Sequence, residues 1–134
     1  MITIETTVKA PIEQVWVCWN EPDHITKWAF ASDDWEAPRA ENDLRVGGRF
    51  KTVMAAKDKS AEFDMAGVYT AVEEGALIEY EFGDRKAKIV FETVPEGVRV
   101  IESFDPEQEN PEEMQRAGWQ AILDNFKKHV EQEA

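Results

Sequence analysis

The chain has 134 residues, of which 28 are acidic and 15 basic, so its formal net charge at pH 7 is −13. This charge argues against nucleic-acid binding and against a basic membrane-surface patch, because both depend on clustered Lys and Arg. The length predicts one domain over residues 1–134, and the single cysteine excludes an intrachain disulfide and fits a cytoplasmic protein.

The sequence begins with a predicted strand and two predicted short helices. Residues 2–8 alternate apolar and polar side chains, which is typical of a half-buried strand. Apolar residues then recur at helical spacing after Pro11, and Pro22 opens a second short helix that we expect to extend through Trp28. The sequence contains neither an apolar run of about 20 residues that could cross a bilayer nor the apolar core of a signal peptide.

The middle of the chain is predicted to be a series of strands. Apolar and polar residues alternate there, and turns interrupt the alternation at intervals of roughly ten residues. This spacing indicates an antiparallel meander. The predicted strands are residues 49–56, 61–72, 78–82, 85–94 and 98–104.

The chain ends in one predicted amphipathic helix over residues 111–132. The order of elements predicts an α+β fold, in which a curved antiparallel sheet of about six or seven strands wraps around this helix. A strongly curved sheet cannot contact a straight helix along its whole length, so we expect a pocket between them. The apolar stripe of the helix consists of Gly118, Trp119, Ile122, Phe126 and Val130.

Five segments, spread over essentially the whole chain, together resemble one known family. They are APIEQVW at 10–16, Trp28, DLRVGGRF at 43–50, GVY at 67–69 and GWQAILDNF at 118–126. In this order they resemble the helix-grip fold of START-like, birch-pollen-allergen-like proteins, the SRPBCC superfamily. Within that superfamily the chain is similar to the AHSA type, which is related to the C-terminal domain of the activator of the heat-shock-protein-90 ATPase.

The resemblance implies several functions and does not choose among them. Helix-grip proteins bind lipids, sterols or polyketides in a cavity, and a few catalyse cyclisation or dehydration there. The AHSA type implies a chaperone partner and a role in the stress response. We therefore expect a domain that binds a small apolar ligand rather than an enzyme. The alternatives are a chaperone-interaction module with an acidic surface and a cavity enzyme of the cyclase or dehydratase type.

Candidate catalytic and metal-binding residues are few. His24 and His129 belong to no metal-binding motif, and Cys18 lies on an apolar helix where the sequence places no basic partner beside it. We therefore predict no metal, no cofactor and no catalytic residue, and interpret these three side chains as surface or packing residues. Among the carboxylates, Glu102 shares a predicted strand face with apolar residues, so it is the best candidate for an acid near the interior, although a solvent-facing Glu is the alternative.

Aromatic and methionine side chains are the main evidence for a ligand pocket. Plain core packing is the alternative interpretation of each one. We also expect residues 29–42 to form a loop in which Phe30 and Trp35 act as a lid. The predicted cavity-lining residues are Trp28, Trp35, Phe50, Met54, Phe63, Met65, Tyr80, Phe82, Phe91, Phe104, Trp119, Ile122 and Phe126.

The negative charge is concentrated in two segments. Residues 73–84 contain five acids and residues 102–113 contain six, and neither segment contains a base. These segments are interpreted either as a solvated face or as a docking patch for a basic partner such as a chaperone. We expect a monomer or a weak dimer.

Overall fold

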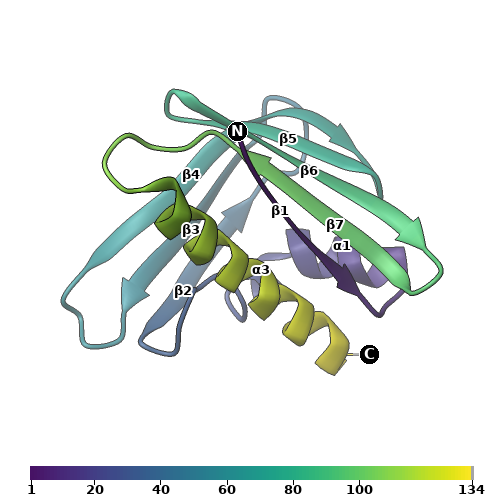
Figure 1. The fold of residues 1–134 in the computed structure, drawn as a ribbon, viewed down its shortest axis with the longest axis horizontal. Coiled ribbons are helices and arrows are strands. Elements are labelled where there is room, and N and C mark those ends of the chain that lie inside the picture. Colours follow the sequence, from purple (N-terminus) through teal and green to yellow (C-terminus); the bar gives the residue numbers. More distant parts are fainter. Residues whose placement is uncertain (134) are drawn as a thin grey trace.

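A curled antiparallel sheet and a long helix that crosses it make up most of the molecule (Figure 1). The computed structural model describes residues 1–133. The helices are α1 (Ile12–Asn20), α2 (Pro22–Ile25) and α3 (Glu112–Glu133). The strands are β1 (Ile2–Val8), β2 (Trp35–Asn42), β3 (Arg49–Ala56), β4 (Glu62–Glu73), β5 (Leu77–Phe82), β6 (Arg85–Val94) and β7 (Gly97–Phe104).

The seven strands form one sheet in the order β1-β7-β6-β5-β4-β3-β2, and every neighbouring pair is antiparallel. This order confirms the predicted meander and adds β1 beside the last strand, β7. Gly47 lies in the turn between β2 and β3, with a φ of 83° that glycine adopts without the steric cost other residues incur. The α+β class, the two short helices after the first strand and the long last helix are confirmed.

Residues 29–42 do not form the loop that the sequence predicted. Eight of them are the edge strand β2, which pairs with β3. Pro38 interrupts the alternation that identifies a strand, and the register of the pair shifts between Glu36 and Arg39. Proline is tolerated at such a position because an edge strand has one side without ladder hydrogen bonds. Trp35 is therefore the first residue of a strand and not part of a lid.

The core fills the space between the concave face of the sheet and the helices. Helix α3 packs against β1 and α1, and its side chains Leu123, Phe126 and Val130 are fully buried. The C-terminal half of α3 thus packs into the core beside α1, while its N-terminal half runs along the edge strand β1, where Arg116 and Gln120 donate hydrogen bonds to the carbonyl oxygens of Thr3 and Glu5 (Figure 1). No helix within residues 1–133 combines the length and the apolar character needed to cross a membrane.

Candidate functional site

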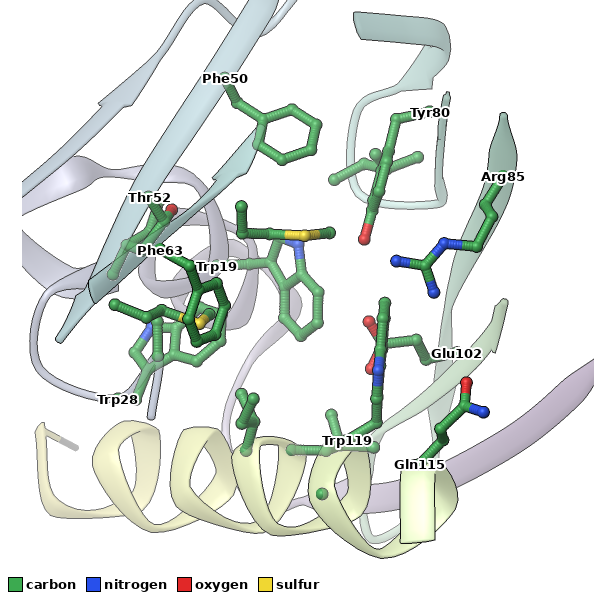
Figure 2. A pocket seen from close by; sticks show the side chains of 18 of the residues that line it. Trp19, Trp28, Phe50, Thr52, Phe63, Tyr80, Arg85, Glu102, Gln115 and Trp119 are labelled. Atoms are coloured by element: carbon green, nitrogen blue, oxygen red, sulfur yellow. The ribbon is translucent and has the colours of Figure 1, made fainter. Parts of the chain in front are cut away.

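A pocket of about 420 Å³ lies between the concave face of the sheet and α3 (Figure 2). This volume is within the range of roughly 300–1,000 Å³ that is typical of small-molecule sites. Side chains from all three helices and from six strands, β2 to β7, line it. The site is therefore built from the whole chain, and its shape depends on how the sheet curls around α3.

Eight of the thirteen residues predicted to line a cavity do line this pocket. They come from the segment after α2, from β3, β4 and β5, and from α3. That a ligand binds to them stays a prediction. The eight are Trp28, Phe50, Met54, Phe63, Met65, Tyr80, Trp119 and Ile122.

Five predicted residues do not line the pocket. Trp35 lies outside it, on the edge strand, and its ring contacts Phe63 with the centroids 5.7 Å apart. The other four are at most 5% exposed and belong to the core behind the pocket wall. Periodicity shows which face of a strand points inward, but it does not show whether a helix covers that position. These four are Phe82, Phe91, Phe104 and Phe126.

The pocket wall is held in place by this second layer of aromatic rings. The Trp119 ring stacks on Phe104, with a centroid distance of 3.8 Å and an interplanar angle of 9°. The Trp28 ring packs edge-on against Phe126 at 4.9 Å, and its Nε1 donates a hydrogen bond to the carbonyl oxygen of Cys18 at 2.9 Å. These contacts hold in position the two rings that face the pocket.

Because Gly67 has no side chain, the Phe50 ring can pack closely against β4. A Cβ atom at position 67 would come within 2.8 Å of two ring carbons of Phe50 and 2.5 Å from the carbonyl oxygen of Glu81. No real Cβ tolerates such distances, so any side chain here would push the Phe50 ring into the pocket. Close packing against Phe50 therefore explains the glycine of the GVY segment at residues 67–69, one of the segments that carry the family resemblance.

The lining of the pocket reaches solvent at Phe63 of β4 and at Met114 in the first turn of α3. Phe63 and Met114 both line the pocket, yet 52% and 60% of their surfaces are exposed. Large apolar side chains with such exposure are the parts of the wall that reach solvent. Asn125 of α3 donates hydrogen bonds to the carbonyl oxygens of Trp28 and Phe30, which ties the segment after α2 to the helix.

One end of the pocket is polar. Figure 2 shows the Glu102 carboxylate, the Tyr80 hydroxyl and the Arg85 guanidinium turned toward the same region, beside Trp119. The Arg85 guanidinium also lies 4.3 Å from the centroid of the Phe82 ring. Sequence reasoning missed Arg85, which follows a turn and has no apolar neighbour pattern to mark it.

Glu102 is an acid inside an apolar wall. It is 6% exposed, and within residues 1–133 no group donates a hydrogen bond to its carboxylate. Burial raises its pKa from 4.5 to about 8, so the carboxyl group is mainly protonated at pH 7. Burial, and the charge that Glu102 would carry, raise the pKa of Tyr80 as well. At neutral pH this end of the pocket therefore offers hydrogen-bond donors: a carboxylic acid, a phenol and a guanidinium.

Tyr69, Asn42 and Gln115, three other polar side chains of the pocket lining, are already paired. The Tyr69 hydroxyl donates to Asn42 Oδ1, and Asn42 Nδ2 donates to the carbonyl oxygen of Asn20 at 2.7 Å. Gln115 accepts from the backbone N–H of Glu107 at 2.8 Å and donates to the carbonyl oxygen of Asn110 at 2.8 Å, which fixes the loop before α3. These groups maintain the shape of the pocket, whereas Glu102 has no partner within the described chain.

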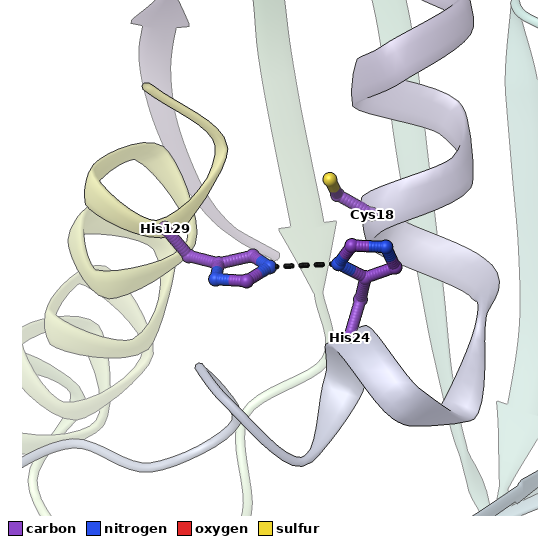
Figure 3. Close-up of side chains that lie close together, drawn as sticks. All are labelled: Cys18, His24 and His129. Atoms are coloured by element: carbon purple, nitrogen blue, oxygen red, sulfur yellow. Dashed lines mark hydrogen bonds between the residues drawn. The ribbon is translucent and has the colours of Figure 1, made fainter. Parts of the chain in front are cut away.

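The fold also brings together Cys18, His24 and His129, although His129 lies more than 100 residues from the other two in the sequence. His24 Nδ1 and His129 Nε2 lie 2.9 Å apart and share a hydrogen bond (Figure 3). Burial raises the pKa of the Cys18 thiol, and the nearby Glu133 carboxylate raises it further. The expected burial of Cys18 is confirmed, but the sequence had placed no imidazole near it. No local motif reveals this group, because its members come from three different helices.

The two acidic segments are less uniform in space than in sequence. Glu102 is buried and contributes nothing to a surface. Glu79 forms an ion pair with Lys88 at 3.8 Å, and Glu81 lies opposite Lys86 in the β5–β6 register. The exposed acids of the two segments that have no such cross-strand lysine are Glu73, Glu74 and Asp84 at the turns on either side of β5, and Glu109, Glu112 and Glu113 in the loop before α3 and its first turn.

Comparison with known proteins gives one family and several similar folds. A family model described as "Activator of Hsp90 ATPase homolog 1-like protein" matches residues 9–131. The solution structure of an AHSA1-like protein from Aeromonas hydrophila is similar, with a TM-score of 0.92 and 46% sequence identity over 97% of this chain and 91% of that chain. A protein from Cytophaga hutchinsonii has 54% identity and a TM-score of 0.84, over 98% of this chain and 92% of that chain.

A more distant similarity shows the fold alone. The crystal structure of a protein from Nitrosomonas europaea has a TM-score of 0.85 but only 21% identity, over 99% of this chain and 95% of that chain. No curated protein matches the chain.

Proposed function

This chain belongs to the Activator of Hsp90 ATPase homolog 1-like family, and on that premise we propose that it binds a small, mainly apolar molecule that carries an oxygen acceptor at one end. The apolar part lies against Trp28, Met54 and Trp119, and the acceptor oxygen faces Glu102 and Tyr80. The chain acts as a binding protein in this proposal, with the ligand entering between Phe63 and Met114.

The observation that carries the proposal is the unpartnered acid in the apolar wall. An uncompensated polar group inside a protein costs on the order of 1–3 kcal/mol, so such groups almost always have partners. Glu102 is 6% exposed and faces the pocket rather than a partner in the chain. A ligand oxygen that accepts its proton supplies the missing hydrogen bond. The volume of about 420 Å³ gives room for the apolar remainder.

The test uses two probes of the same shape, 2-acetylnaphthalene and 2-isopropenylnaphthalene, which differ in one carbonyl oxygen. The indole N–H signals of ¹⁵N-labelled protein report on binding, because Trp19, Trp28 and Trp119 line the pocket and Trp16 does not. We expect 2-acetylnaphthalene to shift the three pocket signals, to leave Trp16 unchanged, and to bind at least about 5-fold more tightly than the isopropenyl analogue, as expected for one hydrogen bond. Equal affinity of the two probes would contradict a hydrogen bond from Glu102 to the ligand oxygen. If neither probe shifts the indole N–H signals of Trp19, Trp28 and Trp119, binding in this pocket is refuted.

A second candidate function is association with a chaperone. The family description and the exposed acids at the start of α3 favour it. Charge-driven association weakens as salt screens it. Titration with purified heat-shock protein 90 in 20 mM and in 500 mM NaCl is the measurement. Salt-sensitive binding supports this candidate, whereas no binding at 20 mM NaCl contradicts it.

A cavity enzyme of the cyclase or dehydratase type stays a prediction. Such an enzyme needs a titratable group inside the pocket, and Glu102, with its pKa of about 8, meets that requirement as a general acid.

A further inference from the structure

Cys18, His24 and His129 form a compact group outside the pocket, where α1, α2 and the end of α3 meet (Figure 3). Cys18 is 1% exposed and His129 is 8% exposed. The Cys18 Sγ atom and one nitrogen of each imidazole all lie within 4.8 Å of one another. A cysteine thiolate and two histidine imidazoles are the kind of side chains from which mixed sulfur and nitrogen zinc sites are built.

We propose that this group binds one Zn²⁺ ion through the Cys18 thiolate and the imidazole nitrogens of His24 and His129. Zinc accepts a mixed set of sulfur and nitrogen ligands, at about 2.3 Å for sulfur and about 2.0–2.1 Å for nitrogen. In a tetrahedral site these bond lengths place the ligand atoms about 3.3–3.6 Å apart. The separations in the group, 2.9 Å between the imidazole nitrogens and at most 4.8 Å overall, lie on both sides of that range.

The ligands need only side-chain adjustments to reach zinc geometry, because the backbone around them is already tied together. Trp28 Nε1 binds the carbonyl oxygen of Cys18 at 2.9 Å, which joins α1 to the segment after α2. Gln14 Nε2 donates to the carbonyl oxygen of Val130 at 3.0 Å, which joins α1 to α3 next to His129. The backbone N–H of Lys9 donates to Glu131 at 2.9 Å on the same side. Preorganisation of this kind reduces the entropy lost when a metal binds.

The charges around the group suit a divalent cation. Glu133 lies one helical turn beyond His129, and its negative charge acts on both Cys18 and His129. Lys27 is the positive group that faces His129. With three ligands from the chain, the fourth position of the zinc ion stays open to water or to a small ligand, as it does in catalytic zinc sites.

The test is titration of the untagged, reduced full chain with Co²⁺, followed by competition with Zn²⁺. Tetrahedral Co²⁺ absorbs in the visible range, and a thiolate ligand adds a charge-transfer band in the near ultraviolet. Because Cys18 is the only cysteine, that band reports on this site alone and not on the many surface carboxylates. We expect the charge-transfer band to saturate at one equivalent of Co²⁺, one equivalent of Zn²⁺ to abolish it, and Zn²⁺ to raise the Tm by at least about 5 °C.

Three variants separate the zinc site from simple packing: Cys18→Ser, His24→Gln and His129→Gln. Each is expected to weaken Zn²⁺ binding at least about 100-fold, and Cys18→Ser also to abolish the charge-transfer band. His24 is only partly buried, so His24→Gln keeps the test valid if a variant at a more buried position fails to fold. Glu96→Gln, in the exposed β6–β7 turn, is the matched control and is expected to bind as the unaltered chain does. A chain without the thiolate band, or Zn²⁺ binding unchanged in His24→Gln, would overturn the proposal.

Discussion

Glu102 is the residue on which the energetics of the pocket depend. The side chain alternates inward on β7 with Val98, Val100 and Phe104, so the strand pattern alone directs it to the interior. Burial then makes the protonated form the stable one, with a pKa of about 8. The folded chain holds a proton on Glu102 that the unfolded chain releases near pH 4.5, and folding therefore couples to pH through this one group.

Replacing Glu102 by Gln is expected to change how stability depends on pH. Because the native pKa of about 8 exceeds the unfolded value of 4.5, the native state binds more protons between these limits. The stability of the unaltered chain therefore falls, relative to Glu102→Gln, as pH rises from about 4.5 to 8, and the difference is constant above that. It reaches at most about 5 kcal/mol, from roughly 1.36 kcal/mol for each pH unit. Urea unfolding at pH 4.5, 6, 7.5 and 9 measures it.

The control for this measurement is Glu96→Gln, which removes an exposed carboxylate from the same chain. Its stability is expected to run parallel to that of the unaltered chain at all four pH values. A parallel course for Glu102→Gln as well would mean that Glu102 ionises in the folded state as it does in the unfolded one.

The two halves of helix α3 have different structural roles. Its second half is core, with Leu123, Phe126 and Val130 fully buried, and it holds the sheet closed. Its first half runs along β1, where Arg116 and Gln120 donate hydrogen bonds to the carbonyl oxygens of Thr3 and Glu5, and it forms a wall of the pocket through Trp119 and Gly118. A glycine in the middle of a helix costs about 1 kcal/mol relative to alanine, so its presence here is unfavourable for the helix itself. It leaves the pocket wider, because a Cβ added at Gly118 meets no atom within 4 Å.

Filling that space is expected to separate stability from binding. Gly118→Ala removes the helix penalty and should stabilise the chain by about 0.5–1 kcal/mol, with little effect on probe affinity. Gly118→Leu projects a larger side chain into the pocket and should reduce the affinity for 2-acetylnaphthalene at least about 10-fold without loss of stability. Thermal unfolding and indole N–H titrations check both. If Gly118→Leu binds the probe as tightly as the unaltered chain does, the probe binds elsewhere.

The loop before α3 is fixed by one side chain of the helix. Gln115, 8% exposed, exchanges hydrogen bonds with the backbone of Glu107 and Asn110. Gln115→Ala leaves these backbone groups unpaired and is expected to cost about 1–3 kcal/mol. Hydrogen exchange should then accelerate at residues 107–110 but not at β6. The exposed neighbour Gln108→Ala is the control and should change neither quantity.

The molecule as a whole carries −13, and the sheet partly neutralises that charge by pairing strands. Lysines of β6 lie opposite glutamates of β5, at Lys88 with Glu79 and Lys86 with Glu81. Like charges at such opposed positions destabilise a sheet, and opposite charges stabilise it slightly. Both acidic segments keep exposed acids without such partners, at Glu73, Glu74 and Asp84 in the first and at Glu109, Glu112 and Glu113 in the second.

Reversing the charge of one of these lysines is expected to show how much the pairing of opposite charges across β5 and β6 stabilises the sheet. Lys88→Glu places two glutamates opposite each other and should destabilise the chain by about 1 kcal/mol in 10 mM NaCl, and by less than half of that in 300 mM NaCl, because the groups are exposed and screened. Lys57→Glu, in the exposed β3–β4 turn, changes the net charge equally and should have a smaller effect. Thermal unfolding at the two salt concentrations measures both, and a salt-independent loss for Lys88→Glu would point to packing instead of charge.

By itself the sequence determined the elements and their order. Alternation gave the strands and the inward position of Glu102, helical spacing gave α1 and α3, and these patterns are local because each depends on residues two to four apart. The edge strand β2 escaped prediction because its identity depends on pairing with β3, and Pro38 hides its alternation.

Only the tertiary structure decided which aromatic side chains line the pocket and which lie behind its wall. Trp119 of α3 lines the pocket, whereas Phe104 of β7, which stacks on the Trp119 ring, lies behind it, and no local pattern distinguishes the two. Likewise, only the packing of α1, α2 and α3 brings Cys18, His24 and His129 within 4.8 Å of one another, since residues more than 100 positions apart meet through the closure of the whole chain and not through any local pattern.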